Sequence, residues 1–226
     1  PFLIFMAIGP QLKRIKAELQ NKIYLVVIFI ISLLISFLIF KNLKINFLVN
    51  TVLVGSAFYL FFITIRDFFW KKPNNIQQNI AHFGFSLLIL SILFNNIFSS
   101  ELITNLKVGE SFKNDRFEII FNDLKKFEEK NYISFKGYFL IKDNQNEDKF
   151  EPELRVYNQP NIVTSEADIK TTFLSDKFIT INTVQNEEYF NIRYQVKPFM
   201  LWIWLSVLLI SFGGIISLFN KKVYEK

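Results

Sequence analysis

His82 is the only histidine of the 226-residue chain, and it lies near the start of the apolar run Ile80–Phe98. An ionisable side chain in a membrane-spanning helix is costly, and it generally faces protein, water or a ligand. A neutral imidazole is also a common axial ligand of haem iron. Residue type alone leaves two interpretations open. His82 either hydrogen-bonds a neighbouring helix or rests at the membrane interface, or it binds a metal.

Other reactive side chains are scarce. The chain contains no cysteine, which excludes a disulfide and any thiolate site for iron, zinc or an Fe–S cluster. One histidine without a thiol also provides no nucleophile–base pair for covalent catalysis. We therefore assign no catalytic residue in this chain.

Four apolar runs are long enough to cross a bilayer as helices, which takes about 20 residues. They cover about Ile23–Phe40, Phe47–Ile65, Ile80–Phe98 and Met200–Phe219. Residues 1–9 are too few, and they begin at Pro1 without a methionine, so we interpret them as a truncated helix of a longer protein. In the third run, His82 falls two or three residues from the helix start. Gly84 and Ser91 share one stripe there, where another helix or a flat macrocycle could approach the backbone closely.

Basic residues cluster beside these runs. Of the 26 basic and 20 acidic residues, 14 and 17 lie in residues 99–199, so the remainder is strongly positive. This distribution is typical of membrane-flanking loops and argues against nucleic-acid binding. The positive-inside rule predicts that the regions around Gln11, Lys72 and Lys226 are cytoplasmic. Residues 99–199 then lie outside the cytoplasm.

Residues 99–199 predict a small antiparallel β domain, because apolar and polar residues alternate along several stretches. The predicted faces contain Phe117, Ile119 and Phe121; Ile133, Phe135, Phe139 and Ile141; Ile179 and Ile181; and Phe190, Ile192, Tyr194 and Val196. Asp143–Asp148 predicts a polar hairpin loop. Ser165, with acidic residues after it, is typical of a helix N-cap and predicts a short helix near Asp168–Leu174.

The predicted fold class is therefore an α+β membrane protein. Transmembrane α-helices are combined with one small extracytoplasmic antiparallel β domain, which is inserted before the last helix. The predicted parts are a helical membrane region at 1–98, the β domain at 99–199, the last transmembrane helix at 200–219 and a cytoplasmic tail at 220–226.

Four short motifs follow one another along the chain. They are Pro1-Phe2-Leu3 with Gly9-Pro10; Arg155-Val156-Tyr157 with Thr164–Ile169; Lys197-Pro198-Phe199 with Trp202-Ile203-Trp204; and Gly213-Gly214. The set resembles the C-terminal portion of the CcmF/NrfE family of cytochrome c-type biogenesis proteins, the membrane haem lyases of cytochrome c maturation. Ser165 looks inserted relative to the family pattern, and Asp168 replaces an alanine.

The resemblance implies a role for His82. The family carries a transmembrane haem ligand in an Ala-His-x-Gly helix before its outer domain, and Ala81-His82-Phe83-Gly84 matches that pattern. By this resemblance, His82 is one axial ligand of a haem b, in the cytoplasmic half of the membrane. The second axial ligand lies outside this chain.

The resemblance also implies function and partners. The chain would be part of a holocytochrome c synthase (haem lyase), supporting covalent attachment of haem to apocytochrome c, with the catalytic groups not complete in this chain. Expected partners are the missing N-terminal part or a split subunit, CcmH-type and CcmE-type maturation proteins, and apocytochrome c. The expected location is the bacterial inner (plasma) membrane with a periplasmic β domain, or the equivalent mitochondrial inner membrane.

Other residues keep two interpretations. Trp202 and Trp204 fit an anchor at the membrane headgroups, or a contact with haem or a partner. Arg155 and Tyr157 fit a partner contact or an ordinary strand surface. For the whole chain, the alternative function is a non-catalytic membrane-anchored scaffold whose β domain binds partner proteins. A transporter subunit is disfavoured because the helices carry almost no charge.

Overall fold

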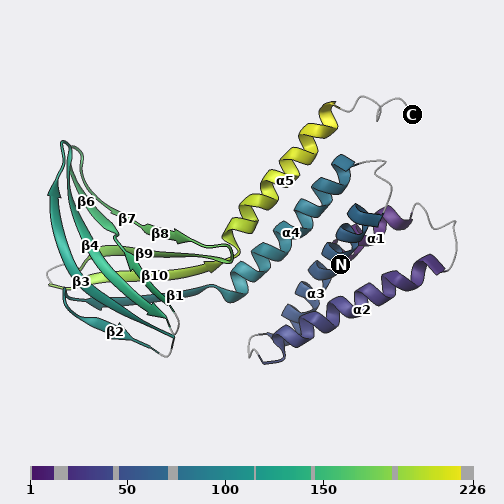
Figure 1. Ribbon diagram of the computed structural model, residues 1–226, viewed down its shortest axis with the longest axis horizontal. Coiled ribbons are helices and arrows are strands. Elements are labelled where there is room, and N and C mark those ends of the chain that lie inside the picture. Colours follow the sequence, from purple (N-terminus) through teal and green to yellow (C-terminus); the bar gives the residue numbers. More distant parts are fainter. Residues whose placement is uncertain are drawn as a thin grey trace. The chain divides into compact units, whose positions relative to one another are not determined.

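The computed structural model describes residues 2–12, 20–42, 46–70, 76–114, 116–143, 146–184 and 188–219 (Figure 1). The chain forms two compact units. Pro1–Ile97 with Phe199–Lys226 make the helical unit, and Phe98–Pro198 make the β domain. Lys13, Lys72 and Lys226, on which the orientation prediction depends, lie outside the described residues, as does the predicted tail 220–226.

The helical unit contains five helices in its described residues. They are α1 (Phe2–Leu12), α2 (Gln20–Phe40), α3 (Phe47–Trp70), α4 (Ile76–Phe98) and α5 (Met200–Phe219). Four of them, α2 to α5, are long and apolar enough to cross a membrane. α4 begins four residues before the apolar run, because Gln77, Gln78 and Asn79 continue the helix. His82 therefore lies about 9 Å along the helix axis from the first residue, and the prediction of two or three residues was wrong.

Side-chain contacts hold α2 against α3. Ser36 of α2 donates a hydrogen bond to the Thr51 carbonyl of α3 at 2.8 Å. The rings of Phe29 and Tyr59 meet edge to face at 5.3 Å between centroids. α1 adds Ala7 to the same cluster of buried residues. These contacts place α1, α2 and α3 together as one packed group.

The β domain has two antiparallel sheets (Figure 1). Sheet A has the order β1 (Ser100–Leu106), β10 (Phe190–Pro198), β9 (Ser175–Thr183) and β8 (Asp168–Thr171). Sheet B has the order β2 (Ser111–Lys113), β3 (Phe117–Glu128), β4 (Tyr132–Asp143), β6 (Glu153–Asn158) and β7 (Asn161–Glu166), and β5 (Asn146–Phe150) also pairs with β4. The first and last strands of the domain are hydrogen-bonded neighbours in sheet A.

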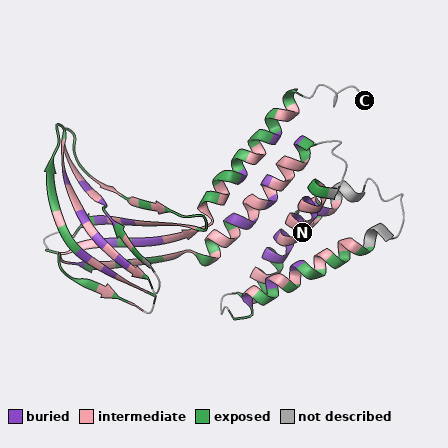
Figure 2. Cartoon of the chain, viewed as in Figure 1, coloured by how far each residue is buried: buried purple, intermediate pink, exposed green. Residues whose placement is uncertain are grey.

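A single apolar cluster fills the β domain. Its buried members alternate along strands of both sheets, as the purple segments in Figure 2 show. They include Ile119, Phe121, Phe139, Ile141, Ile179, Ile181, Ile192 and Tyr194. Phe121 and Phe139 stack at 4.4 Å between ring centroids. The predicted fold class, helices with one small antiparallel β domain before the last helix, is confirmed.

The predicted helix near Asp168–Leu174 was wrong. Asp168–Thr171 form strand β8, and Ser165 belongs to β7. Both supposed capping residues have distant partners instead. Ser165 donates from its hydroxyl to the Ile181 carbonyl at 2.8 Å, and the Asp168 carboxylate accepts from the Glu151 N–H at 2.6 Å. The predicted loop at Asp143–Asp148 is also shorter, because β4 and β5 stay paired from Asp148 down to Asn146.

Candidate functional site

One face of α4 is closed by α5 through two glycines. A Cβ on Gly84 would meet the Ile210 backbone nitrogen at 3.0 Å. From the other side, a Cβ on Gly213 would meet the Gln77 carbonyl oxygen at 2.8 Å and the Ala81 nitrogen at 2.9 Å. Residues 77, 81 and 84 follow helical spacing, so they form one stripe. The expectation that a helix approaches closely at Gly84 is confirmed, and Gly213 is the counterpart in α5.

A second face of α4 meets α3. The Ser86 and Thr64 hydroxyls lie 2.9 Å apart in a buried hydrogen bond. The Phe83 ring stacks on Phe61 at 5.7 Å, and Asn79 donates to the Asp67 carbonyl at 3.4 Å. Positions 79, 83 and 86 again follow helical spacing. The α3 and α5 contacts together fix the rotation of α4 about its own axis.

His82 lies on neither of these faces. At 3.6 residues per turn it shares a third face with Gln78 and Phe85. Its Nε2 lies 3.3 Å from Gln78 Nε2, one turn earlier on the same helix. Phe85 packs against the cluster that α1, α2 and α3 form around Tyr59. The imidazole of His82 is half-buried on this third face.

The donor chemistry of this face fits one axial ligand of a haem. An axial ligand must present one imidazole nitrogen, and the hydrogen-bond partner of His82 among the described residues comes from its own helix. The described part of the chain holds no cluster of three or more His, Cys, Asp or Glu side chains. Among the described residues, His82 is the side chain that could offer an imidazole nitrogen to iron.

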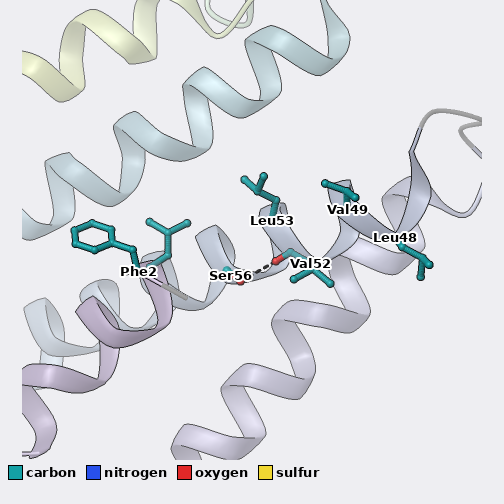
Figure 3. A pocket seen from close by; sticks show the side chains of 7 residues that line it. Phe2, Leu48, Val49, Val52, Leu53 and Ser56 are labelled. Carbon is teal, nitrogen blue, oxygen red and sulfur yellow. Dashed lines mark hydrogen bonds between the residues drawn. The ribbon is translucent and has the colours of Figure 1, made fainter.

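Described residues of the helical unit also line apolar hollows. One, of about 280 Å³, is lined by Ile65, Phe68, Phe69, Ile80, Phe83, Leu209 and Phe212 of α3, α4 and α5. Another, of about 560 Å³, lies between α1 and α3 and is lined by Phe2, Leu3, Leu48, Val49, Val52, Leu53 and Ser56 (Figure 3). The Ser56 hydroxyl is committed to the Val52 carbonyl at 2.7 Å (Figure 3). Both hollows suit hydrocarbon, and neither includes His82 in its lining.

Two of the three tryptophans, Trp202 and Trp204, lie in the first turns of α5. Trp204 is 63% exposed, and Trp202 is less exposed. The Trp202 carbonyl accepts a hydrogen bond from the buried Ser206 hydroxyl at 2.6 Å. An exposed indole at a helix start suits a membrane interface. Headgroup anchoring stays the prediction for both residues.

Arg155 and Tyr157 lie on one face of β6, within a network of charged and aromatic side chains. Arg155 Nε donates to the Glu153 carboxylate at 3.1 Å, and its guanidinium lies 5.1 Å from the Tyr132 ring centroid. The Tyr157 and Tyr132 rings lie 5.2 Å apart. Lys136 joins the network through Glu153 at 3.4 Å. We name the set Tyr132, Lys136, Glu153, Arg155 and Tyr157 the β4–β6 patch.

Sequence reasoning missed the Thr64–Ser86 bond and the contact of Gln78 with His82. A signal existed for the contact of Gln78 with His82. Polar residues are rare within apolar runs, and those four or seven residues apart on one helix share a face. What could not be read from one run is which face meets which helix.

Comparisons with known proteins agree with this architecture. Residues 97–198 match the family model of the CcmF C-terminal β-sandwich. The chain is 31% identical to the cytochrome c-type biogenesis protein CcmF of Pseudomonas fluorescens over 150 residues, which is 66% of this chain and 23% of the relative. It is 25% identical to CcmF of Escherichia coli (strain K12), with 100% of this chain and 36% of the relative covered.

A solved structure of the cytochrome c haem lyase CcmF shares the fold, with a TM-score of 0.67 and 16% identity over 94% of this chain and 37% of the other. A cytochrome c-type biogenesis protein NrfE of Haemophilus influenzae is 23% identical over 76% of this chain. The chain spans 23% to 36% of the length of the CcmF relatives cited. It belongs to the CcmF/NrfE family of cytochrome c-type biogenesis proteins and corresponds to their C-terminal portion.

Proposed function

We propose that this chain is part of a membrane haem lyase of cytochrome c maturation, and that His82 supplies one axial ligand of a haem b. The observation that carries the proposal is the position of the half-buried His82 on a face of α4 other than the stripe that α5 closes. The residues of the family pattern around it, Ala81 and Gly84, serve the α5 contact instead. The second axial ligand would come from a segment outside this chain.

The residues around His82 have distinct tasks in this proposal. Gly84 and Gly213 hold the α4 backbone at a fixed height and rotation against α5. Gln78 Nε2 lies 3.3 Å from Nε2 of the imidazole, so the Gln78 side chain must move aside, or the ring must turn, for coordination. A haem bound there would supply one-electron redox chemistry.

The β domain would provide a docking surface on the side of the membrane opposite the cytoplasm. The β4–β6 patch supports this role, because tyrosine and arginine are enriched at protein interfaces. Apocytochrome c and CcmH-type or CcmE-type proteins are the proposed partners. No residue described in this chain is assigned to the thioether chemistry itself.

The test is absorption spectroscopy of the complete purified protein in detergent. We expect His82→Ala to diminish or abolish the Soret and reduced α bands of the b-type haem, and added imidazole to restore them in part. Ile89→Ala is the matched control, since position 89 lies on the same face two turns further along and has no ligating atom. A folded His82→Ala protein with an unchanged spectrum and haem content would refute the ligand assignment.

A scaffold without haem is the second candidate, and the β4–β6 patch favours it independently of His82. The scaffold and the haem lyase subunit predict different effects of substitution. A scaffold predicts that Arg155→Ala with Tyr157→Ala weakens partner capture while His82→Ala leaves cytochrome c maturation intact. A haem lyase subunit predicts that His82→Ala alone impairs maturation.

A further inference from the structure

The turn between β8 and β9 presents two large apolar side chains to the surface. Phe173 is 65% exposed and Leu174 is 59% exposed. Adjacent apolar residues are unusual at a hairpin tip, where glycine, asparagine and other polar residues predominate. Exposed apolar groups that cluster in this way indicate an interaction site.

Hydrogen bonds between Thr172 and Ser175 close the base of this turn. The Thr172 N–H donates to the Ser175 carbonyl at 2.9 Å. The Ser175 N–H donates to the Thr172 hydroxyl oxygen at 3.1 Å, and that hydroxyl donates to the Ser175 carbonyl at 2.7 Å. Polar backbone groups are expensive in a medium without water unless they are paired. The paired groups of Thr172 and Ser175 therefore add little to the cost of moving the tip out of water.

The strand register places the tip at one particular end of sheet A. Ser175 is the Cα partner of Pro198, and such partners lie about 5 Å apart. Pro198 is separated from the start of α5, Met200, by a single residue. At the same end Ser100 pairs with Val196, and the chain reaches Ser100 directly after α4. Covalent continuity therefore puts this end of the sheet where the chain passes into both membrane-spanning helices.

The charges nearest the tip compensate each other. Asp176 and Lys197 are cross-strand partners of opposite sign. On the other strand of the hairpin, Lys170 lies 3.9 Å from the Asp148 carboxylate. No net charge of these side chains opposes approach to a lipid surface, and lysines beside an apolar tip suit anionic headgroups.

We infer that Phe173 and Leu174 form a lipid anchor, which inserts into the leaflet on the β-domain side and ties the membrane-proximal end of sheet A to the bilayer. The partner is the lipid surface itself. The anchor adds a third attachment between the two covalent ones, so it limits rocking of the β domain about the residues that join it to α4 and α5. It does not depend on haem or on the proposed lyase function.

The absence of cysteine in this chain permits a direct test. Leu174→Cys is labelled with an environment-sensitive fluorophore, and the full chain is reconstituted into vesicles of phosphatidylethanolamine and phosphatidylglycerol. Nitroxide-labelled lipids then report contact with hydrocarbon by quenching. Val108→Cys is the matched control: Val108 is 45% exposed, and it follows Leu106, which pairs with Phe190 at the opposite end of sheet A.

We expect lipid quenching at position 174 to exceed that at position 108 by at least about twofold, and Phe173→Ser in the labelled protein to reduce it. Equal quenching at the two positions would overturn the inference. A label at 174 that emits as if shielded from water but is not quenched by the lipids would also overturn it, because the tip would then be covered by protein. Neither position lies in the core, so the labelled chains are expected to fold.

Discussion

Gly213 of α5 lies against Ala81 of α4, so that a Cβ on the glycine would come within 2.9 Å of the Ala81 backbone nitrogen. Ala81 immediately precedes His82. The contact therefore sets the height and rotation of the turn from which the imidazole projects. The direction of the His82 side chain therefore depends on α5, which begins more than a hundred residues later in the sequence.

Substitution of Gly213 should separate the two helices. Gly213→Ala forces a methyl group into the Ala81 backbone, and overpacking of this kind costs about 1–3 kcal/mol. We expect a lower midpoint of thermal unfolding in detergent and, in the complete protein, a shifted or weakened haem spectrum.

The neighbouring glycine is the matched control. A Cβ on Gly214 would have no heavy atom within 4 Å. Gly214→Ala should therefore leave stability unchanged or raise it by up to about 1 kcal/mol through helix propensity. Equal destabilisation by the two variants would mean that the α4–α5 contact is not as close as the structure has it.

Much of the fold could be predicted because its signals are local. Runs of apolar residues identified four spanning helices, and alternation identified buried strand positions such as Ile119, Phe121 and Ile192. The helix predicted near Asp168 failed because a capping sequence is also local evidence, and the partners of Ser165 and Asp168 lie in other strands. Tertiary pairing overrode a weak local preference.

The sequence could single out His82 by its residue type, but it could not predict the direction in which the side chain faces. A lone histidine in a spanning helix draws attention through its cost alone. Which way His82 faces depends on where α3 and α5 pack, and this follows from side chains far apart in sequence, such as Thr64 with Ser86. Similarly, Gly213 and Gly214 are neighbours in the sequence, but a Cβ would meet α4 at Gly213 and no heavy atom within 4 Å at Gly214.

The buried hydrogen bond between α3 and α4 can be measured by a double-mutant cycle. Thr64→Val and Ser86→Ala each remove one hydroxyl of a 2.9 Å pair. Polar pairs between membrane helices are worth about 0.6 kcal/mol on average and up to about 1.7. We expect a coupling energy in that range in detergent unfolding. Thr64→Val with Ser56→Ala is the control pair, because Ser56 bonds within its own helix, and it should give additive effects.

Ser165 should stabilise the β domain as a link between the two sheets. The Ser165 hydroxyl in sheet B donates a hydrogen bond to the backbone carbonyl of Ile181 in sheet A. The side chain of Ile181 is fully buried. Ser165→Ala should cost about 1 kcal/mol in unfolding free energy. Ser111→Ala, at an exposed position of β2, should cost much less. If Ser165 instead acted as a helix cap, circular dichroism of the variant would lose helical signal, which we do not expect.

Glu153 should make the stability of the β domain depend on pH. Burial by itself would raise the pKa of this carboxyl, but hydrogen bonds from Arg155, Lys136 and Ser134 outweigh burial and hold the pKa below its ordinary value of 4.5. The folded state then binds the proton less readily than the unfolded chain does. The stabilisation is complete above about pH 4.5, and it is lost as the pH falls through the lower folded-state pKa.

Glu153→Gln tests this dependence. At neutral pH the free energy of unfolding of the variant should be about 1 kcal/mol lower than that of the wild type. This difference should shrink towards zero as the pH is lowered. Near-UV circular dichroism during denaturant unfolding is a suitable measurement, because the Tyr132 and Tyr157 rings beside the network lie 5.2 Å apart.

Glu188→Gln is the control. Glu188 pairs with Lys107 at 2.9 Å but is 85% exposed. Solvent and salt therefore screen the pair, and the loss of stability in this variant should be smaller. A difference between wild type and Glu153→Gln that stayed constant with pH would show that the carboxylate charge does not stabilise this network.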